Sequence, residues 1–396
     1  MPDTESVLQL GMVAGEPSGD LLGAGVLAGF KRLGIKVHGV GVGGPAMLAQ
    51  GFENLAHMDE LAVNGFVDPL RRLPSLLGLL RRLKAQLLER QVDGFLGVDF
   101  NVFNLLLEGQ LKRAGLPTAH YVSPSVYAWR RGRINRIARS ADLLLALYPF
   151  EPPLYADSPI KVAYVGHPLA DAIEPPDREA RQVARAELAI APEQQCIALL
   201  PGSRRSELDL MLPLFLEAAQ RLQVALQPVT FVVPVPREAL RAQVLATCAE
   251  YPQLAVIVDD QPARRALTAA SGALVKSGTS TLEALLLRTP MVVSYRLGNL
   301  SYQLVRRLLR TRYIALPNIL AGRALVPELL QNDATAASLA QALLVQLDND
   351  AMRADYLEGA GALHSQLAQD ANLSAARALH EMLAPAAGPT PLESFN

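Results

Sequence analysis

Two acidic residues of this sequence follow short apolar runs, where a carboxylate could act as an acid or a base. Asp99 comes directly after the run Gly94–Val98, and Glu16 comes shortly after the run Val7–Val13. Ligands of open α/β sheets bind outside the carboxyl ends of the strands, and a carboxylate there can take a proton from a bound hydroxyl. We therefore predict Asp99 as a general base, with Glu16 as the second candidate for a catalytic role.

The turn Gly15–Asp20 precedes the periodic stretch Leu21–Leu33, which predicts a helix. Ser18 and Gly19 would present backbone N–H groups at the positive end of that helix, a place that attracts anions. The alternative is that Ser18 and Asp20 only cap the helix. The residue types alone do not separate these two interpretations.

The second half of the chain contains two comparable turns. Pro201–Arg204 follows the apolar run Cys196–Leu200, and its arginine offers a permanent, forked charge to a diphosphate. Ser277–Thr281 has small residues that let a phosphate approach the backbone, and the Glu283 carboxylate could accept hydrogen bonds from a sugar diol. The alternative for Glu283 is a favourable charge near a helix N-terminus, which contributes about 0.3–1 kcal/mol. The candidate binding residues are Gly202, Ser203, Arg204, Ser277, Gly278, Thr279 and Glu283.

Two other features resemble functional sites but favour structural interpretations. Gly39–Gly44 fits the G-x-G-x-x-G pattern of dinucleotide-binding turns, but Pro45–Gln50 allows only a short helix and no acidic strand end follows at the required distance. We interpret it as a glycine-rich loop at the sheet edge. His120 and His167 also lie near strand ends, where a structural role is the more frequent one for a lone histidine.

Two parallel sheets must position these turns. Apolar runs alternate with helical stretches in the first half of the chain, and the pattern restarts after Ile173–Asp177, whose two prolines cannot continue a helix. This predicts two doubly wound α/β domains, over residues 1–174 and 175–340, with C-terminal helices and a frayed tail over 341–396. Besides the runs named above, the predicted strands are Val37–Val40, Thr118–Val122, Leu143–Leu147, Val162–Val165, Val229–Val233, Ala255–Val258, Gly272–Val275 and Met291–Val293.

Composition narrows the class of protein. A chain of 396 residues is longer than one with a single hydrophobic core usually is, so two domains are expected. The balance of 37 basic against 38 acidic residues argues against nucleic acid as the main partner. Hydrophobic residues make up 50% of the chain, and mean hydropathy is +0.19. No apolar run reaches the roughly 18 residues of a membrane span. The 2 cysteines suit neither a disulfide framework nor a zinc site, and the N-terminus lacks a secretory pattern, so we expect a cytoplasmic location.

Several short strings, taken together and in this order, resemble the lipid-A-disaccharide synthase family. Any one of them would be weak, but the ordered set is specific and covers residues 9–331. The strings are VAGEPSGD (13–20), YVSPSV (121–126), AWR (128–130), PFE (149–151), GHP (166–168), LPGSR (200–204), SGT (277–279) and LPNILAGR (316–323).

The resemblance implies a glycosyltransferase of the GT-B type, with two Rossmann-like domains facing a cleft and the donor nucleotide on the second domain. It implies that UDP-2,3-diacylglucosamine is joined to 2,3-diacylglucosamine 1-phosphate (lipid X). The products are the β-1,6 lipid A disaccharide 1-phosphate and UDP. The reaction inverts the anomeric carbon, and the resemblance implies neither a metal nor another cofactor.

The resemblance also implies roles for single residues. Asp99 would take the proton from the acceptor 6-hydroxyl, and Glu16 would orient the acceptor or be the base itself. Contacts to the acceptor or its phosphate would come from Ser18, Gly19 and Ser123. On the donor side, the UDP charge would be held by Arg204, the Ser277–Thr279 amides and Arg323, the ribose by Glu283, and the site would be lined by Asn318 and Gln331.

Two positions depart from the family's usual pattern. The family reads Asp-x-Pro-Asp-Phe-Asn where this chain has Asn101 for the proline and Val102 for the second aspartate, so Asp99 has no carboxylate partner there. Tyr127 stands where tryptophan is common. The alternatives are another GT-B enzyme, such as a UDP-sugar 2-epimerase or a transferase with a soluble acceptor, and a non-catalytic nucleotide-sugar-binding protein.

The stretch Arg71–Arg90, RRLPSLLGLLRRLKAQLLER, interleaves basic residues with leucines. This pattern suits an anionic bilayer surface, and the alternative is an ordinary amphipathic helix packed on the sheet. A second basic stretch contains Arg306, Arg307, Arg310 and Arg312 and could contact phosphate or lipid headgroups. We expect a peripheral protein on the inner face of the inner membrane. Its apolar C-terminal third, with the helices of 341–396, could support a homodimer or pack back across the cleft.

Overall fold

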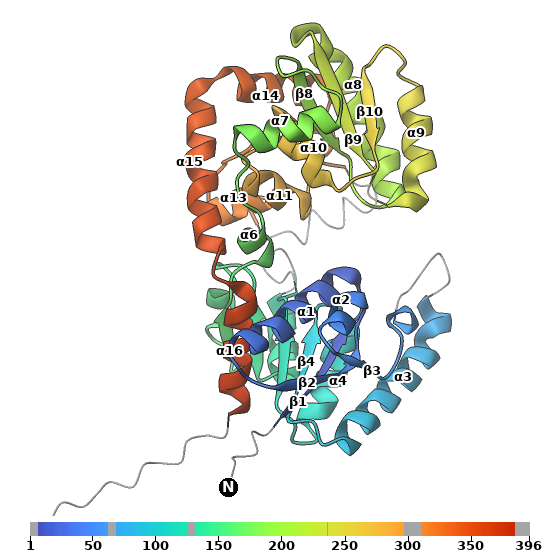
Figure 1. The fold of residues 1–396 in the computed structure, drawn as a ribbon, viewed down its shortest axis with the longest axis vertical. Helices are drawn as coiled ribbons and strands as arrows, with labels where there is room; N and C mark the ends of the chain where they lie inside the picture. Colours follow the sequence, from blue (N-terminus) through green and yellow to red (C-terminus); the bar gives the residue numbers. More distant parts are fainter. Residues whose placement is uncertain (1–6, 62–68, 125–130, 236, 297–310, 385–396) are drawn as a thin grey trace, which may run out of the picture. The chain divides into compact units, whose positions relative to one another are not determined.

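The computed structural model describes residues 7–61, 69–124, 131–235, 237–296 and 311–384, with the side chains of 69–73 and 131 excepted. It divides into two compact units (Figure 1). Unit 1 comprises Met1–Pro168 together with Leu367–Asn396, and unit 2 comprises Leu169–Gln366. The chain therefore leaves unit 1 once and returns to it for its last helix.

Unit 1 contains, within its described part, a seven-stranded parallel sheet in the order β3-β2-β1-β4-β5-β6-β7. Apolar side chains alternate between its two faces: Met12 packs into one core cluster and its neighbour Val13 into another. Burial on both faces is the reason that these strands read as continuous apolar runs. The strands are β1 (Leu8–Ala14), β2 (Val37–Val42), β3 (Glu53–Asn54), β4 (Gly94–Val98), β5 (Thr118–Tyr121), β6 (Leu143–Ala146) and β7 (Lys161–Tyr164).

Helices cover both faces of this sheet (Figure 1). On one face lie α1 (Pro17–Arg32), α2 (Pro45–Ala49) and the returning α16 (Ala371–Leu383), which packs along α1. On the other lie α3 (Pro69–Glu89), α4 (Asn101–Lys112) and α5 (Ile134–Ser140). The sheet is thus doubly wound.

The helix α3 is an amphipathic helix packed on the sheet along part of its length. Leu79, Leu80, Leu83 and Leu87 are buried in the core beneath it. Leu77 and Leu88 stay exposed, and so do the arginines Arg81 and Arg82. None of the described helices combines the length and the apolar character needed to cross a membrane.

Unit 2 contains, in the part of it that is described, a six-stranded parallel sheet in the order β10-β9-β8-β11-β12-β13. The strands are β8 (Gln195–Leu200), β9 (Val229–Pro234), β10 (Val256–Asp259), β11 (Gly272–Lys276), β12 (Met291–Tyr295) and β13 (Glu328–Leu330). The helices α8 (Arg205–Ala225), α9 (Arg241–Ala249) and α14 (Ala336–Asp348) share one apolar cluster with this sheet.

Unit 2 contains further described helices besides these three. They are α6 (Pro168–Ala172), α7 (Arg178–Glu187), α10 (Ala263–Ala269), α11 (Ser280–Leu286), α13 (Leu316–Ala321) and α15 (Asp350–Leu367). The linker proline stretch ends at Asp177, whose carboxylate caps α7 by accepting from Ala180 N at 2.8 Å. The C-terminal segment predicted over 341–396 is shared between the units, because α14 packs on α8 and α16 on α1.

The prediction of two parallel α/β sheets is confirmed, and each predicted strand corresponds to a strand of the structure with ends within about two residues. Two strands were not predicted. Glu53–Asn54 is only two residues long, and Glu328–Leu330 begins with a glutamate on an edge of the sheet. Neither carries an apolar run long enough to predict a strand.

Candidate active site

Both sets of candidate turns lie at the point where the strand order of their sheet reverses. In unit 1 this point lies between β1 and β4, where Ala14 pairs with Val98, and the turns with Glu16 and Asp99 follow these two residues. In unit 2 it lies between β8 and β11. Ligands of open α/β sheets bind outside the carboxyl ends of strands at such a point.

The turn that carries Asp99 has an unusual backbone. Asp99 and Phe100 have φ of 49° and 42°, two consecutive non-glycine residues in the left-handed region. This conformation costs about 1–3 kcal/mol per residue and persists only where the surroundings impose it. Here the Asn104 side chain imposes it, since Nδ2 lies 3.1, 3.2 and 2.9 Å from the carbonyl oxygens of Val13, Val98 and Asp99.

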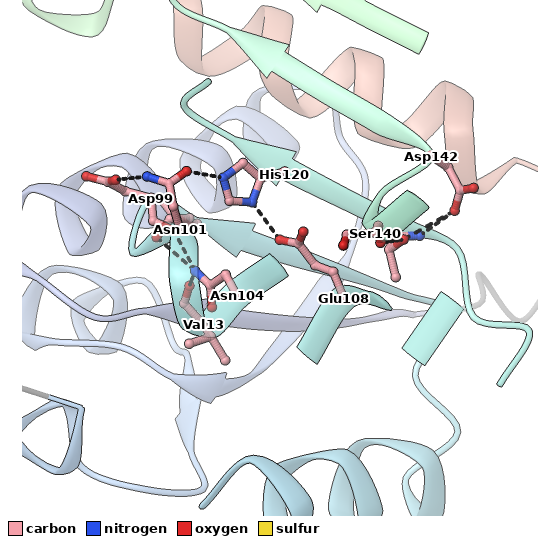
Figure 2. A network of polar contacts seen from close by, with 10 residues as sticks. Val13, Asp99, Asn101, Asn104, Glu108, His120, Ser140 and Asp142 are labelled. Carbon is pink, nitrogen blue, oxygen red and sulfur yellow. Dashed lines mark hydrogen bonds and ion pairs between the residues drawn. The ribbon is translucent and has the colours of Figure 1, made fainter. Parts of the chain in front are cut away.

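A chain of polar contacts connects Asp99 to the core of unit 1, as Figure 2 shows. Asn101 Nδ2 donates to Asp99 Oδ1 at 3.2 Å, and His120 Nε2 lies 3.0 Å from Asn101 Oδ1. His120 Nδ1 lies 2.7 Å from Glu108 Oε1. Burial raises the pKa of Glu108, although the neighbouring His120 opposes this shift. His120 thus has a structural partner, as a lone buried histidine usually does.

The helix N-terminus beside Glu16 is open. Glu16 and Ser18 are exposed, and α1 has no side-chain cap, so neither Ser18 nor Asp20 caps it. Asp20 instead accepts hydrogen bonds from the amides of Gly44, Ala46 and Met47 at 2.8–3.0 Å. Its carboxylate thus occupies the place where a phosphate would bind in a dinucleotide-binding turn. This supports the structural interpretation of Gly39–Gly44.

The structure contradicts a direct acceptor contact by the Ser123 hydroxyl. Ser123 is buried, and its Oγ lies 2.7 Å from Tyr155 Oη and donates to Pro124 O at 3.2 Å. The neighbouring Glu151 is also buried, and burial raises its pKa to about 7, against a hydrogen bond from Tyr148 N. Burial lowers the pKa of His167 to about 4. Ser123 therefore belongs to the packing beneath the site.

In unit 2, the turn after β8 has a backbone suited to an anion. Gly202 has φ +122°, and a Cβ there would lie 2.5 Å from Glu207 Oε2, so glycine is required. Arg204 is exposed, and its side chain makes no hydrogen bond or ion pair with another described residue. Ser203 N, however, donates to Glu207 Oε2 at 2.9 Å. A phosphate could use this amide only in place of Glu207.

Lys276, which sequence reasoning missed, lies at the end of β11 beside this turn. Its Nζ is 2.9 Å from Glu207 Oε1 and 4.8 Å from the centre of the Tyr295 ring. Burial acts to raise the pKa of Glu207, but the hydrogen bonds from Lys276 and Ser203 N outweigh it and lower that pKa. The signal for Lys276 was its place at a strand end, directly before Ser277. Glu207 could have been found as an acid in the first turn of α8.

The turn after β11 offers fewer amides than predicted. Ser277 N donates to Ser294 O at 2.9 Å, so it is committed to the sheet. The amides of Gly278 and Thr279 make no hydrogen bond to another described residue. Glu283 lies one turn further on, with Oε1 3.4 Å from Arg264 Nε, and its side chain is 22% exposed. Gly278, Thr279 and Glu283 therefore remain open to a ligand.

Three predicted donor-site residues have other partners or positions. Asn318 is buried, and its carboxamide is fully used: Nδ2 donates to Val326 O and Glu328 Oε1, and Oδ1 accepts from Leu325 N and Val326 N. Its prediction as a donor contact is corrected, because no polar atom is left for a ligand. Arg323 forms a forked pair with Asp355 at 2.7 and 2.8 Å. Gln331 lies at the carboxyl end of the edge strand β13, away from the β8/β11 switch point.

Some predictions lie outside the described residues. They are the arginines Arg306, Arg307 and Arg310, the side chains of Arg71 and Arg72, and the motif residues 125–130, with Tyr127 among them. Arg312 is described and lies over the Tyr313 ring. Among the residues that the structure does cover, no group of three or more His, Cys, Asp or Glu side chains could hold a metal ion.

Solved structures of GT-B glycosyltransferases and epimerases are similar in fold to this chain. A UDP-GlcNAc 2-epimerase from Neisseria meningitidis matches with a TM-score of 0.61 at 12% identity, covering 95% of this chain and 99% of that one. MurG from Acinetobacter baumannii matches with a TM-score of 0.58 at 15% identity, covering 95% and 100%. At such identities the likeness shows the fold alone, and it confirms the GT-B prediction.

Sequence comparison distinguishes between the functions that this fold supports. The model of the family described as lipid-A-disaccharide synthetase matches residues 10–381. The lipid-A-disaccharide synthase of Burkholderia vietnamiensis is 45% identical over 97% of this chain and 98% of its own length. That of Pseudomonas aeruginosa is 42% identical over 95% and 98%. The match spans both half-sites, by which we mean the candidate turns at the β1/β4 and at the β8/β11 switch point. The chain belongs to the lipid-A-disaccharide synthase family of glycosyltransferases.

Proposed function

We propose that this enzyme joins UDP-2,3-diacylglucosamine to 2,3-diacylglucosamine 1-phosphate, giving the β-1,6 disaccharide 1-phosphate and UDP. The observation that carries the proposal is the family match over residues 10–381, because it includes the turns at both switch points. The epimerase alternative shares the fold at low identity only. An enzyme that transfers a sugar from a diphosphate needs a base that deprotonates the acceptor. It also needs a site that binds the negatively charged diphosphate as it leaves.

In this proposal unit 1 binds the acceptor. Asp99 takes the proton of the acceptor's 6-hydroxyl while the oxygen of that hydroxyl forms a bond to the donor's anomeric carbon. Support for this role comes from the position of Asp99 at the β1/β4 switch point and from the backbone that holds it there. Glu16 orients the acceptor, and the amides of Ser18 and Gly19 at the start of α1 receive its phosphate.

Unit 2 binds the donor in the same proposal. The guanidinium of Arg204 and the amides of Gly278 and Thr279 hold the diphosphate as UDP leaves. Glu283 binds the ribose hydroxyls. Lys276 adds a positive charge beside this turn, and its pairing with Glu207 fixes its position while no anion is bound. Glu207 would release Ser203 N for the phosphate.

The test is UDP release by the full chain with UDP-2,3-diacylglucosamine, in the presence and absence of 2,3-diacylglucosamine 1-phosphate. The proposal expects release only with the acceptor, together with a disaccharide product. Release without acceptor would indicate hydrolysis or epimerisation, and no release in either case would indicate a binding protein. Either outcome contradicts the transferase proposal.

We also propose that α3 docks on an anionic bilayer, where both lipid substrates reside. The support is the exposed surface that its described part leaves free, with Leu77 38% and Leu88 36% exposed beside the exposed Arg81. Apolar side chains flanked by arginines bind the interface of anionic membranes. The buried leucines of the same helix keep it attached to unit 1, so docking needs no unfolding.

A further inference from the structure

Asn101 lies between the candidate base and a buried acid–histidine pair, and its side chain contacts both (Figure 2). The other three residues of this network come from different elements: Asp99 follows β4, Glu108 lies on α4, and His120 lies on β5. The contacts of 3.2, 3.0 and 2.7 Å form one continuous chain from a half-buried carboxylate to the core.

The chemistry of Asp99 determines the direction of each hydrogen bond. A carboxylate only accepts, so the NH₂ group of Asn101 must face Asp99. The carbonyl oxygen of Asn101 then faces His120, whose Nε2 must carry a hydrogen. One further proton lies between His120 Nδ1 and Glu108 Oε1. The pair is neutral overall, whichever of the two atoms holds that proton.

The Glu108–His120 pair keeps a fixed position because both side chains are buried in the core. Both side chains are 0% exposed, and Gly97 provides their room, since a Cβ there would lie 2.0 Å from Glu108 Oε1. Glu108 Oε2 has no hydrogen-bond partner among the described residues, which leaves His120 as the main partner of this carboxyl group. Separating such a buried pair is costly, so His120 keeps one orientation.

The Asp99 side chain needs a support of its own, in addition to the one that Asn104 gives to the backbone. Asn104 holds the backbone of the left-handed turn, and its hydrogen bonds there go to carbonyl oxygens and not to the Asp99 carboxylate. Within the described structure, Asn101 is the residue that bonds the Asp99 carboxylate itself. A base gains rate only when its oxygen is held in line with the proton that it removes, and a misplacement of about 1 Å can cost about 100-fold.

We propose that Asn101, His120 and Glu108 are positioning residues: the buried pair orients the Asn101 carboxamide, which holds the Asp99 carboxylate in the orientation that accepts the proton. This inference rests on the proposed function, in which Asp99 is the base. None of the three touches a reacting atom. Their effect is therefore on turnover, through Asp99, and not on donor binding.

The first experiment compares Asn101→Ala and the nearly isosteric Asn101→Asp with Leu106→Ala, a control on the same helix at an exposed site. We expect kcat to fall about 10- to 100-fold in both Asn101 variants, while the KM for the donor and the melting temperature stay unchanged. Asn101→Asp keeps the acceptor for His120 but replaces the donor to Asp99 with a repelling carboxylate. An unchanged kcat in the Asn101 variants would overturn the proposal.

The second experiment removes the buried pair as a whole. The variant His120→Phe with Glu108→Leu replaces both partners by apolar groups and leaves no unpaired buried charge. We expect the same fall in kcat as for Asn101→Ala, and no further fall when the two changes are combined. Additive losses would show that the pair does not act through Asn101. If this variant does not fold, the Asn101 variants decide alone.

The third experiment is a double-mutant cycle with Asp99→Asn. Because Asn101 acts through Asp99, Asn101→Ala should change the residual rate of Asp99→Asn by less than about twofold. An equal loss in both backgrounds overturns the positioning role. Full turnover by Asp99→Asn would instead refute the base itself, and with it the proposed mechanism. A slow Asp99→Asn beside an unaffected Asn101→Ala refutes the positioning role only.

Discussion

The two half-sites occupy the same place in their sheets but are built from opposite chemistry. At the β1/β4 switch point of unit 1, polar groups hold a carboxylate in place. Asn104 bonds the backbone of the turn, and Asn101 connects Asp99 to the buried Glu108–His120 pair. At the β8/β11 switch point of unit 2, the candidate groups are an exposed guanidinium, backbone amides and a lysine. In the proposed mechanism, the first half-site depends on the position and protonation of Asp99, and the second on positive charge.

This difference agrees with the roles proposed for the two units. A base must hold one oxygen in one place at the right protonation state, which buried hydrogen bonds achieve. A diphosphate site must attract a large anion and release it after the reaction, which exposed cations and amides achieve at lower cost. Changes in unit 1 should therefore alter turnover and pH dependence, whereas changes in unit 2 should alter donor affinity and salt dependence.

The largest expected effect comes from Asp99. Asp99→Asn should lower kcat by about 10²–10⁴-fold, because the acceptor hydroxyl loses its base, while UDP affinity remains as in the unaltered enzyme. Steady-state kinetics and calorimetric UDP titration measure the two quantities. Glu16→Gln is the matched variant on the neighbouring strand end. A larger loss of kcat in Glu16→Gln than in Asp99→Asn would transfer the role of base to Glu16.

The next effect concerns stability and pH in unit 1. Burial raises the pKa of Glu151 to about 7 from 4.5 in the unfolded chain, so between these pH values the folded state holds more protons than the unfolded state. Stability must then fall as pH rises through this window, by up to about 3 kcal/mol.

Glu151→Gln removes this titration and keeps an acceptor for Tyr148 N. Denaturant unfolding at pH 5 and pH 8 measures the effect. We expect the variant to gain stability over the unaltered protein at pH 8 and to differ little at pH 5. A difference that is the same at both pH values would contradict the raised pKa of Glu151.

A smaller effect is expected at the charged half-site. Arg204→Ala should weaken UDP binding by about 1.5–3 kcal/mol, the range for a hydrogen bond to a charged group. Lys276→Met should weaken it in the same direction. Titrations at low and high ionic strength should show a weaker salt dependence in both variants. Arg221→Ala, an exposed arginine further along α8, is the control. If Asp99→Asn weakened UDP binding as much as Arg204→Ala, the contrast between the half-sites would fail.

The smallest effects belong to α3. Arg81→Gln should weaken binding to phosphatidylglycerol-containing vesicles by about 1 kcal/mol, with no change on phosphatidylcholine alone. Arg82 pairs with Glu60 at 2.7 Å where both side chains are exposed, so Arg82→Gln should cost no more than about 1 kcal/mol of stability. Vesicle flotation measures the binding, with Arg221→Gln as the control. Equal binding of the enzyme to both kinds of vesicle would refute docking through charge.

The sequence predicted the fold well because parallel strands buried on both faces leave apolar runs that can be read directly. It also placed Asp99, Arg204 and Gly278 at strand ends, where the structure puts the switch points. It failed where a motif residue has a packing role. Asn318 and Ser123 match the family strings, but their hydrogen bonds are used within the protein.

The local pattern of residue types determined by itself that this chain forms two doubly wound sheets with charged or acidic turns at their strand ends. Only the tertiary structure decided which side chains have polar atoms left for a ligand. Glu108 and His120 are 12 positions apart and Lys276 and Glu207 are 69 apart, so their pairing depends on neighbouring strands and helices. Hydrogen bonds and burial depend on distance in space, and a sequence lists only neighbours along the chain.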